Sequence, residues 1–93
     1  PIIVEAESLS EVRQAIAGKA DIILLDNMTP SMVRQAVALI KNRALIEVSG
    51  GITIKNVRAM AAAGVDRISI GALTHSAPAA ALSLVMTPIG RQR

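Results

Sequence analysis

Short apolar runs alternate along this chain with segments of helical periodicity, and this alternation constrains the fold more than any other feature. The continuous apolar run at 21–25 is typical of a strand in a parallel sheet that is buried on both faces. Strands that alternate with single helices form βαβ units with right-handed crossovers. Four strands are expected on this basis, at residues 2–6, 21–25, 44–48 and 67–70. The sequence therefore predicts an α/β fold that contains four parallel βα units.

The starts of the three helices between these strands carry capping residues. Ser8, with Glu11 three residues later, has the spacing of a capping box. Thr29 stands directly before a proline, which is favoured at the first position of a helix. Thr53 can cap a third helix that we expect to run to Ala63. Each helix is therefore expected to begin shortly after the preceding strand ends.

The length of the chain limits how much of a closed barrel it can form. It has 93 residues, of which 52% are hydrophobic, so it can bury a core. A closed (β/α)₈ barrel takes roughly 250 residues. Four βα units make half of such a barrel, with two open sheet edges and an uncovered interior. The chain also opens inside an apparent strand, which indicates a piece of a longer protein.

Composition excludes several classes of function. The chain has no aromatic residue, so it lacks the stacking platform of single-strand nucleic-acid binders, and its net charge of +3 is modest. Its apolar runs are too short to span a bilayer. Cysteine is absent, which excludes disulfides and thiolate metal sites and fits a cytoplasmic protein. We expect neither a nucleic-acid partner nor a membrane partner.

Three acidic residues recur at or near the ends of the expected strands. Glu5, Asp26 and Glu47 are each separated by 21 residues. In barrels of this kind the residues at the C-terminal strand ends form the active site. Converging carboxylates repel one another unless a cation or hydroxyl donors accompany them, so Mg²⁺, the hydroxyls of a sugar, or both, are the natural partners. Asp26 and Asn27 could instead simply shape the turn after their strand.

Two glycine-containing segments follow the last two of these strands. They are Ser49-Gly50-Gly51 and Gly71-Ala72, each expected in a loop before a helical start. Glycine lets backbone N–H groups approach an oxyanion closely, and barrels commonly hold phosphate in the loops after their last two strands. His75, the only histidine, could donate a hydrogen bond to such a phosphate or could simply pack or cap. Together these residues favour a phosphate-binding site.

Four motifs along the chain match a known family in order and spacing. They are ILLDNM at 23–28, EVSGGIT at 47–53, GVD at 64–66 and GALTHS at 71–76, preceded by VEAESL at 4–9. The set resembles the C-terminal part of the quinolinate phosphoribosyltransferase family, also called carboxylating nicotinate-nucleotide pyrophosphorylases. The likeness extends over nearly the whole chain to about Met86.

The resemblance implies a two-part enzyme, with an open sandwich domain built upstream and an incomplete α/β barrel. Residues 1–80 would be the last βα units of the barrel, residues 81–86 a final strand that returns to the sandwich, and residues 87–93 a tail. The implied reaction converts quinolinate and phosphoribosyl pyrophosphate to nicotinate mononucleotide, pyrophosphate and CO₂, with Mg²⁺ required. The rest of the same enzyme and a second copy in a homodimer or larger oligomer would be its protein partners.

The resemblance also assigns roles to individual residues. Glu5 and Asp26 would contact the ribose hydroxyls or Mg²⁺, and Glu47 is a further substrate-binding candidate at the same rim. The residues expected around the ribose 5-phosphate are Ser49, Gly50, Gly51, Gly71, Ala72, Leu73 and His75.

One departure from the family bears on substrate. The family grips quinolinate with Arg, Lys and His residues that precede this segment, so we expect the chain alone to be inactive. A related phosphoribosyltransferase or family paralogue with another substrate, an inactive structural half-barrel, and a generic phosphate-binding barrel remain alternative interpretations.

Overall fold

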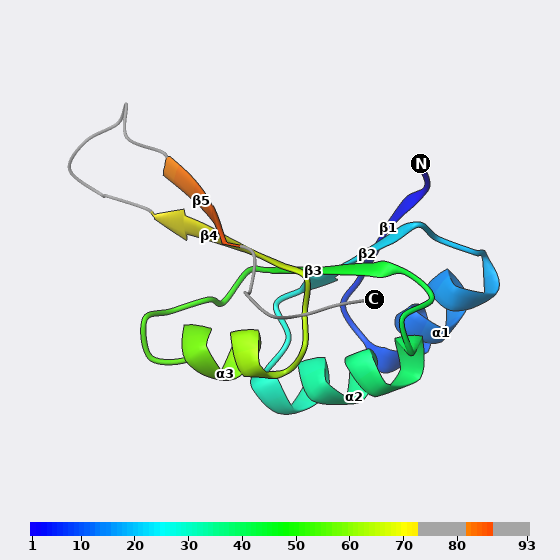
Figure 1. The fold of residues 1–93 in the computed structure, drawn as a ribbon, viewed down its shortest axis with the longest axis horizontal. Coiled ribbons are helices and arrows are strands. Elements are labelled where there is room, and N and C mark those ends of the chain that lie inside the picture. The colour runs from blue at the N-terminus through cyan, green and yellow to red at the C-terminus, as the bar shows by residue number, and fades with distance from the viewer. Residues whose placement is uncertain (73–81, 87–93) are drawn as a thin grey trace.

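The computed structural model describes residues 1–72 and 82–86, and its strands and helices alternate as the sequence predicts (Figure 1). The first four strands are parallel and lie in the order β1-β2-β3-β4, while β5 joins β4 in the antiparallel direction. The elements are β1 (Ile3–Ala6), α1 (Leu9–Ala17), β2 (Ile22–Asp26), α2 (Pro30–Ile40), β3 (Leu45–Ser49), α3 (Val57–Ala62), β4 (Arg67–Ala72) and β5 (Leu82–Met86). The predicted α/β class with four parallel strands is therefore confirmed.

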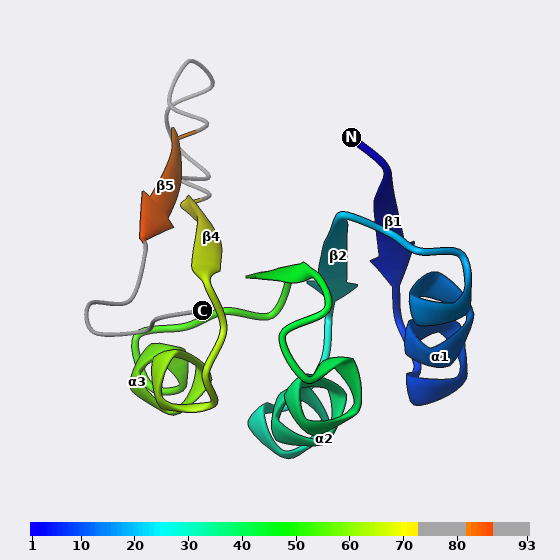
Figure 2. The same cartoon turned by 45° about the vertical axis from the view of Figure 1, so that its right-hand side comes forward.

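All three helices lie on the same side of the sheet (Figures 1 and 2). The strand side chains that face them are buried, and they pack against the apolar stripes of the helices in one core. This core includes Ala6, Ile23, Leu25, Ile46, Val48 and Ile68 from the strands and Val12, Ala15, Val33, Ala36, Ile40 and Met60 from the helices. Because burial follows the two-residue period of each strand, the sheet has one apolar, helix-covered face.

The opposite face of the sheet is uncovered within residues 1–72. Ile3 is 60% exposed and Leu45 is 46% exposed, although both lie in strands. The run at 21–25 was expected to be buried on both faces, but Ile22 and Leu24 are only half-buried. The described helices supply a cover for one face only, which agrees with the open interior predicted for half a barrel.

The expected caps form at the first two helices. Ser8 Oγ accepts a hydrogen bond from Glu11 N at 3.2 Å, and Thr29 Oγ1 accepts one from Met32 N at 3.2 Å. The capping box at α1 differs in one bond, because Glu11 Oε1 accepts from Glu7 N at 2.7 Å. This bond ties the helix to the segment that follows β1.

The third helix begins later than expected, at Val57. A turn at 54–56 precedes it, and Thr53 and Asn56 exchange two bonds across this turn. Thr53 Oγ1 accepts from Asn56 N at 3.2 Å, and Asn56 Oδ1 accepts from Thr53 N at 2.8 Å. These are the reciprocal bonds of a capping box, so Thr53 does cap this segment, with the regular helix starting one turn on.

Two aspartates tie the starts of neighbouring strands together, a feature that the sequence analysis missed. Asp21, just before β2, accepts a hydrogen bond from Ile2 N at 2.6 Å. Asp66, just before β4, accepts one from Ile46 N at 2.8 Å. Each carboxylate thus satisfies a backbone donor at the start of the adjacent strand, which helps to set the register between strands.

The end of β4 differs from the expected loop. Gly71 and Ala72 lie within β4, because antiparallel pairing with Ser83 and Leu82 of β5 extends the strand past Ile70. The final strand expected at 81–86 is present as β5, and its return to a sandwich domain stays a prediction. Residues 73–81 and the tail at 87–93 lie outside the described part of the chain.

No helix within the described part of the chain combines the length and the apolar character needed to cross a bilayer.

Truncation of residues on the two faces of β3 is expected to lower the free energy of unfolding by different amounts. Ile46 is fully buried against the helices, so Ile46→Ala should lower the free energy of unfolding by about 2–5 kcal/mol. Leu45, its neighbour on the uncovered face, provides the matched control, and Leu45→Ala should cost less than about 1 kcal/mol. Urea unfolding of the two variants measures the difference, and equal losses would show that the uncovered face is packed in solution.

Candidate functional site

The strand register places the acidic residues on the uncovered face, in two adjacent rows. Glu5 and Glu47 both pair with Leu24, one from β1 and the other from β3, so they lie level with each other. Asp26 lies two residues further along β2, where it pairs with Ser49. The equal spacing of 21 residues therefore brings the three to one face but not into one row, because the register shift differs between the two strand pairs.

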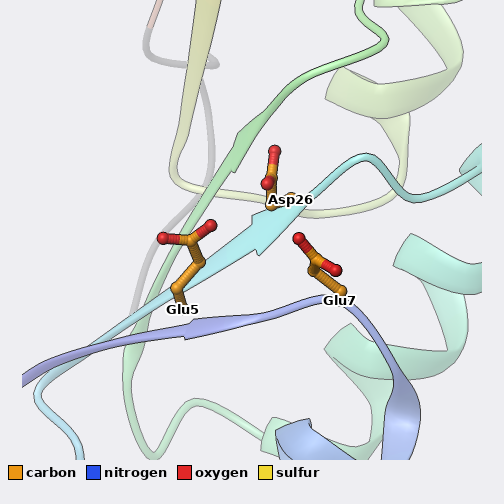
Figure 3. A group of neighbouring side chains, drawn as sticks. All are labelled: Glu5, Glu7 and Asp26. Carbon is orange, nitrogen blue, oxygen red and sulfur yellow. The ribbon is translucent and has the colours of Figure 1, made fainter.

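Three carboxylates converge at the ends of β1 and β2. Ligand oxygens of Glu5, Glu7 and Asp26 lie within 4.8 Å of one another, and Figure 3 shows their side chains turned toward a common space. Glu7 belongs to this group although the sequence analysis did not name it as a site residue. We call these three residues the acidic cluster.

Glu47 is engaged elsewhere. Its Oε1 lies 3.5 Å from Nη1 of Arg67, the residue that faces it on β4. The side chain of Glu47 is 26% exposed and that of Arg67 is 57% exposed, so the pair is accessible to water and adds little to stability. The structure thus brings Glu5 and Asp26 together, as predicted, and pairs Glu47 with an arginine at the same face.

Crowding in the acidic cluster changes the titration of Glu5. The neighbouring Asp26 carboxylate raises the pKa of Glu5 above 4.5, chiefly because it accepts a hydrogen bond from the protonated form and also because it repels the charged form. Desolvation and the charges of Glu7 and Glu11 raise the pKa of Glu5 further. Such a group binds a cation or a hydroxyl donor readily, because either relieves the repulsion.

The glycine loop after β3 lies directly against this cluster. Gly50 and Gly51 both have positive φ, at 70° and 71°, which side-chain-bearing residues rarely adopt. A Cβ on Gly50 would overlap Oδ1 of Asp26. Asn27 N donates a hydrogen bond to the carbonyl oxygen of Ser49 at 2.9 Å. The acidic strand end and the glycine loop therefore share one mouth of the sheet, as the sequence predicts.

The second glycine segment is described only in part. The backbone of Gly71 and Ala72 runs within β4, whereas Leu73 and His75 lie outside the described residues. The assignment of these four residues to a phosphate stays a prediction.

Two residues of the site could have been found from sequence alone. Glu7 follows Glu5 by two residues, which is the spacing that returns a side chain to the same side of an extended segment. Asn27 follows a strand and precedes a helix, and asparagine is enriched in the left-handed conformation that it adopts here with φ of 57°.

This arrangement combines oxygen ligands with a glycine-lined backbone. Carboxylates are suitable ligands for Mg²⁺ and for sugar hydroxyls, and backbone next to positive-φ glycines can approach a phosphate without obstruction by a side chain. The site can therefore hold a ligand that has a phosphate at one end and hydroxyls or a metal ion at the other.

The raised pKa of Glu5 predicts how stability varies with pH. Its contribution to stability is fully present below pH 4.5 and is lost as the pH rises through the higher folded-state value. Glu5→Gln should therefore flatten the dependence of the melting temperature on pH and should stabilise the chain at pH 7. Asp26→Asn should bring the NMR titration of the Glu5 carboxyl back toward 4.5, and an unchanged titration would contradict the proposed cause.

Comparison with protein families agrees with this geometry. Residues 1–85 match the model of the quinolinate phosphoribosyl transferase C-terminal domain. A probable carboxylating nicotinate-nucleotide pyrophosphorylase of Archaeoglobus fulgidus is 49% identical over 86 residues, which cover 87% of this chain and 33% of that protein. The human carboxylating nicotinate-nucleotide pyrophosphorylase is 39% identical over 84 residues, which cover 87% and 28%. The chain thus spans about a third of the length of these relatives.

Solved structures give the same result. The nicotinate-nucleotide pyrophosphorylase from Francisella tularensis superposes with a TM-score of 0.70 at 40% identity, over 89% of this chain and 30% of that one. The enzyme of the same name from Ehrlichia chaffeensis gives a TM-score of 0.71 at 42% identity, over 74% and 25%. Sequence and fold agree: this chain belongs to the quinolinate phosphoribosyl transferase family and is a part of its C-terminal domain.

Proposed function

We propose that this chain supplies the ribose-phosphate side of an active site that converts quinolinate and phosphoribosyl pyrophosphate to nicotinate mononucleotide, pyrophosphate and CO₂. The observation that carries the proposal is the close approach of Gly50 to the carboxylate of Asp26, which leaves no room for a Cβ between them. It joins a backbone suited to phosphate to side chains suited to ribose hydroxyls. The names of the relatives, carboxylating nicotinate-nucleotide pyrophosphorylases, support the same reaction.

In this proposal the glycine loop holds the 5-phosphate. Gly50 and Gly51 leave the backbone open to a phosphate oxygen, and the Ser49 hydroxyl can donate a hydrogen bond beside them. Gly71, Ala72, Leu73 and His75 are the further residues expected around the phosphate. Holding the phosphate supplies binding energy away from the reacting carbon, which positions the sugar for attack by the pyridine nitrogen.

The carboxylates act at the sugar. Glu5 and Asp26 accept hydrogen bonds from the ribose hydroxyls, and their negative charge stabilises the positive charge that develops at the anomeric carbon. The carbon–oxygen bond to pyrophosphate breaks as the bond to the pyridine nitrogen forms. CO₂ then leaves from the ring carbon next to the nitrogen, and the electron pair of the broken bond stays on that carbon, where the adjacent positive nitrogen stabilises it. A proton from water then takes the place of CO₂ on this carbon. The same carboxylates keep the sugar oriented throughout.

The acidic cluster is also suited to Mg²⁺. Its three carboxylates offer oxygen ligands within 4.8 Å of one another, and a bound cation would relieve the repulsion from Asp26 that contributes to the raised pKa of Glu5. Glu5 and Asp26, with Glu7 beside them, would hold the ion. When bound, Mg²⁺ neutralises negative charge on the pyrophosphate.

In our proposal, recognition of quinolinate depends on basic residues from outside this chain. On the uncovered face, the side chain of Arg67 pairs with that of Glu47. We propose that the remainder of the same enzyme covers this face, where Ile3 and Leu45 are exposed, and brings the basic residues that grip quinolinate. Assembly as a homodimer or larger oligomer and a cytoplasmic location stay predictions.

A hybrid enzyme tests the proposed reaction. This chain would replace the matching third of the Archaeoglobus fulgidus relative, which supplies the remaining two thirds. We expect the hybrid to form nicotinate mononucleotide from quinolinate and phosphoribosyl pyrophosphate, and we expect EDTA to abolish turnover and Mg²⁺ to restore it. A hybrid that folds, as judged by a cooperative melt, but forms no product would contradict the proposal.

Asp26→Asn in the hybrid tests the role of the cluster. Loss of one charge next to the anomeric carbon should lower kcat by about 100-fold, a size typical for removal of one preorganised electrostatic group. Glu47→Gln is the matched comparison, because its carboxylate is paired with Arg67 outside the cluster, and it should change kcat much less. Product analysis by chromatography measures both variants.

The isolated chain should form no product. It has the ribose-phosphate side of the proposed site but not the residues expected to grip quinolinate, so calorimetry should detect no binding of quinolinate to the 93-residue chain. Turnover by this chain alone would show that these residues suffice and would overturn the division of roles.

A further inference from the structure

Asn27 lies between the acidic end of β2 and the glycine loop. Its backbone N–H donates to the carbonyl oxygen of Ser49 at 2.9 Å, one residue beyond the Asp26–Ser49 pair that ends the β2–β3 ladder. Its φ of 57° turns the chain out of the strand at this point. The bond therefore fixes the residue from which the glycine loop departs.

The loop backbone packs directly against Asn27. A Cβ on Gly51 would lie 3.0 Å from Asn27 Oδ1, and a Cβ on Gly50 would lie 3.1 Å from Asn27 N. The Cα atoms of both glycines therefore stand close to Asn27, one against its side chain and the other against its backbone. Truncation of the side chain at position 27 would therefore leave space beside Gly51, whose carbonyl oxygen accepts a hydrogen bond from Asn56 Nδ2 at 2.8 Å.

The left-handed conformation at this position favours a small set of residues that includes asparagine. Apart from glycine, asparagine and aspartate are the residues that adopt a left-handed conformation most readily. Glycine has no side chain to support Gly51, and aspartate would add a negative charge beside Asp26 and beside a bound phosphate. Asparagine alone combines the conformation, the contact and neutrality.

We infer that Asn27 is a positioning residue, one that fixes the Gly50–Gly51 backbone relative to the Asp26 carboxylate so that phosphate and ribose are held at the correct separation. This inference rests on the proposed function. It concerns the phosphate-holding half of the site, so substitution of Asn27 affects the use of phosphoribosyl pyrophosphate and leaves quinolinate recognition intact.

The test uses the hybrid enzyme with Asn27→Gly, which keeps the left-handed backbone and removes the side chain. We expect KM for phosphoribosyl pyrophosphate to rise about tenfold or more, a modest effect for a misplaced binding group, with KM for quinolinate unchanged. Asn27→Asp should also raise KM for phosphoribosyl pyrophosphate, because it places a second negative charge beside the bound phosphate. A merely structural role would not produce this selectivity for one of the two substrates.

Asn42→Gly provides the matched control. Asn42 also has a left-handed backbone, with φ of 62°, but it lies between α2 and β3, away from the strand ends that carry the site. The same substitution there should leave both KM values unchanged. If Asn27→Gly leaves KM for phosphoribosyl pyrophosphate unchanged in an active hybrid, the inference is overturned and the proposed reaction stands.

Inorganic phosphate provides a test that does not need turnover. In the 93-residue chain, phosphate should shift the NMR signals of the Gly50 and Gly51 amides, and Asn27→Gly should abolish the shifts while Asn42→Gly retains them. If the hybrid is inactive but this pattern is seen, the proposed reaction fails and the positioning role is supported. If phosphate shifts neither amide in the unsubstituted chain, the positioning role is overturned whatever the hybrid does.

Discussion

The contact between the glycine loop and the end of β2 is the constraint on which the site depends. Gly50 leaves no room for a Cβ beside the Asp26 carboxylate, so the loop backbone and the acidic side chain lie next to each other. The Asn27–Ser49 hydrogen bond prolongs the β2–β3 ladder into this region. In the proposed function, a backbone suited to phosphate on one strand end and a carboxylate suited to hydroxyls on the next are thereby placed side by side.

The rest of the fold places the ends of β2 and β3 side by side at the same edge of the sheet. Burial of alternate strand residues under the helices leaves the intervening residues on the other face, and Glu5, Asp26 and Glu47 are among them. Asp21 and Asp66 fix the opposite ends of the strands by binding backbone N–H groups of the neighbouring strand. The register that results places Asp26 opposite Ser49, at the start of the glycine loop.

Local features of this structure could be predicted from sequence, because they depend on residues close in the chain. The caps at Ser8 and Thr29 and the positions of the four strands along the chain are of this kind. The positions of the carboxylates along neighbouring strands could not be predicted, because they depend on strand register. The sequence spacing between them is equal, but the register shift differs between the β1–β2 pair and the β2–β3 pair. The extension of β4 through Ala72 was missed for a similar reason, since it depends on pairing with β5.

The ends of β2 and β3 differ in charge, and together they restrict the class of ligand more than either end does alone. The acidic cluster suits a cation or hydroxyl donors, because its carboxylates repel one another and Asp26 raises the pKa of Glu5. The glycine backbone offers no charge and suits an oxyanion instead. Because Gly50 lies next to Asp26, a ligand that satisfies both in the proposed function carries its anionic group only a few bonds from its hydroxyls or cation. A pentose phosphate does so, whereas a free phosphate or a free sugar would meet only one half of the site.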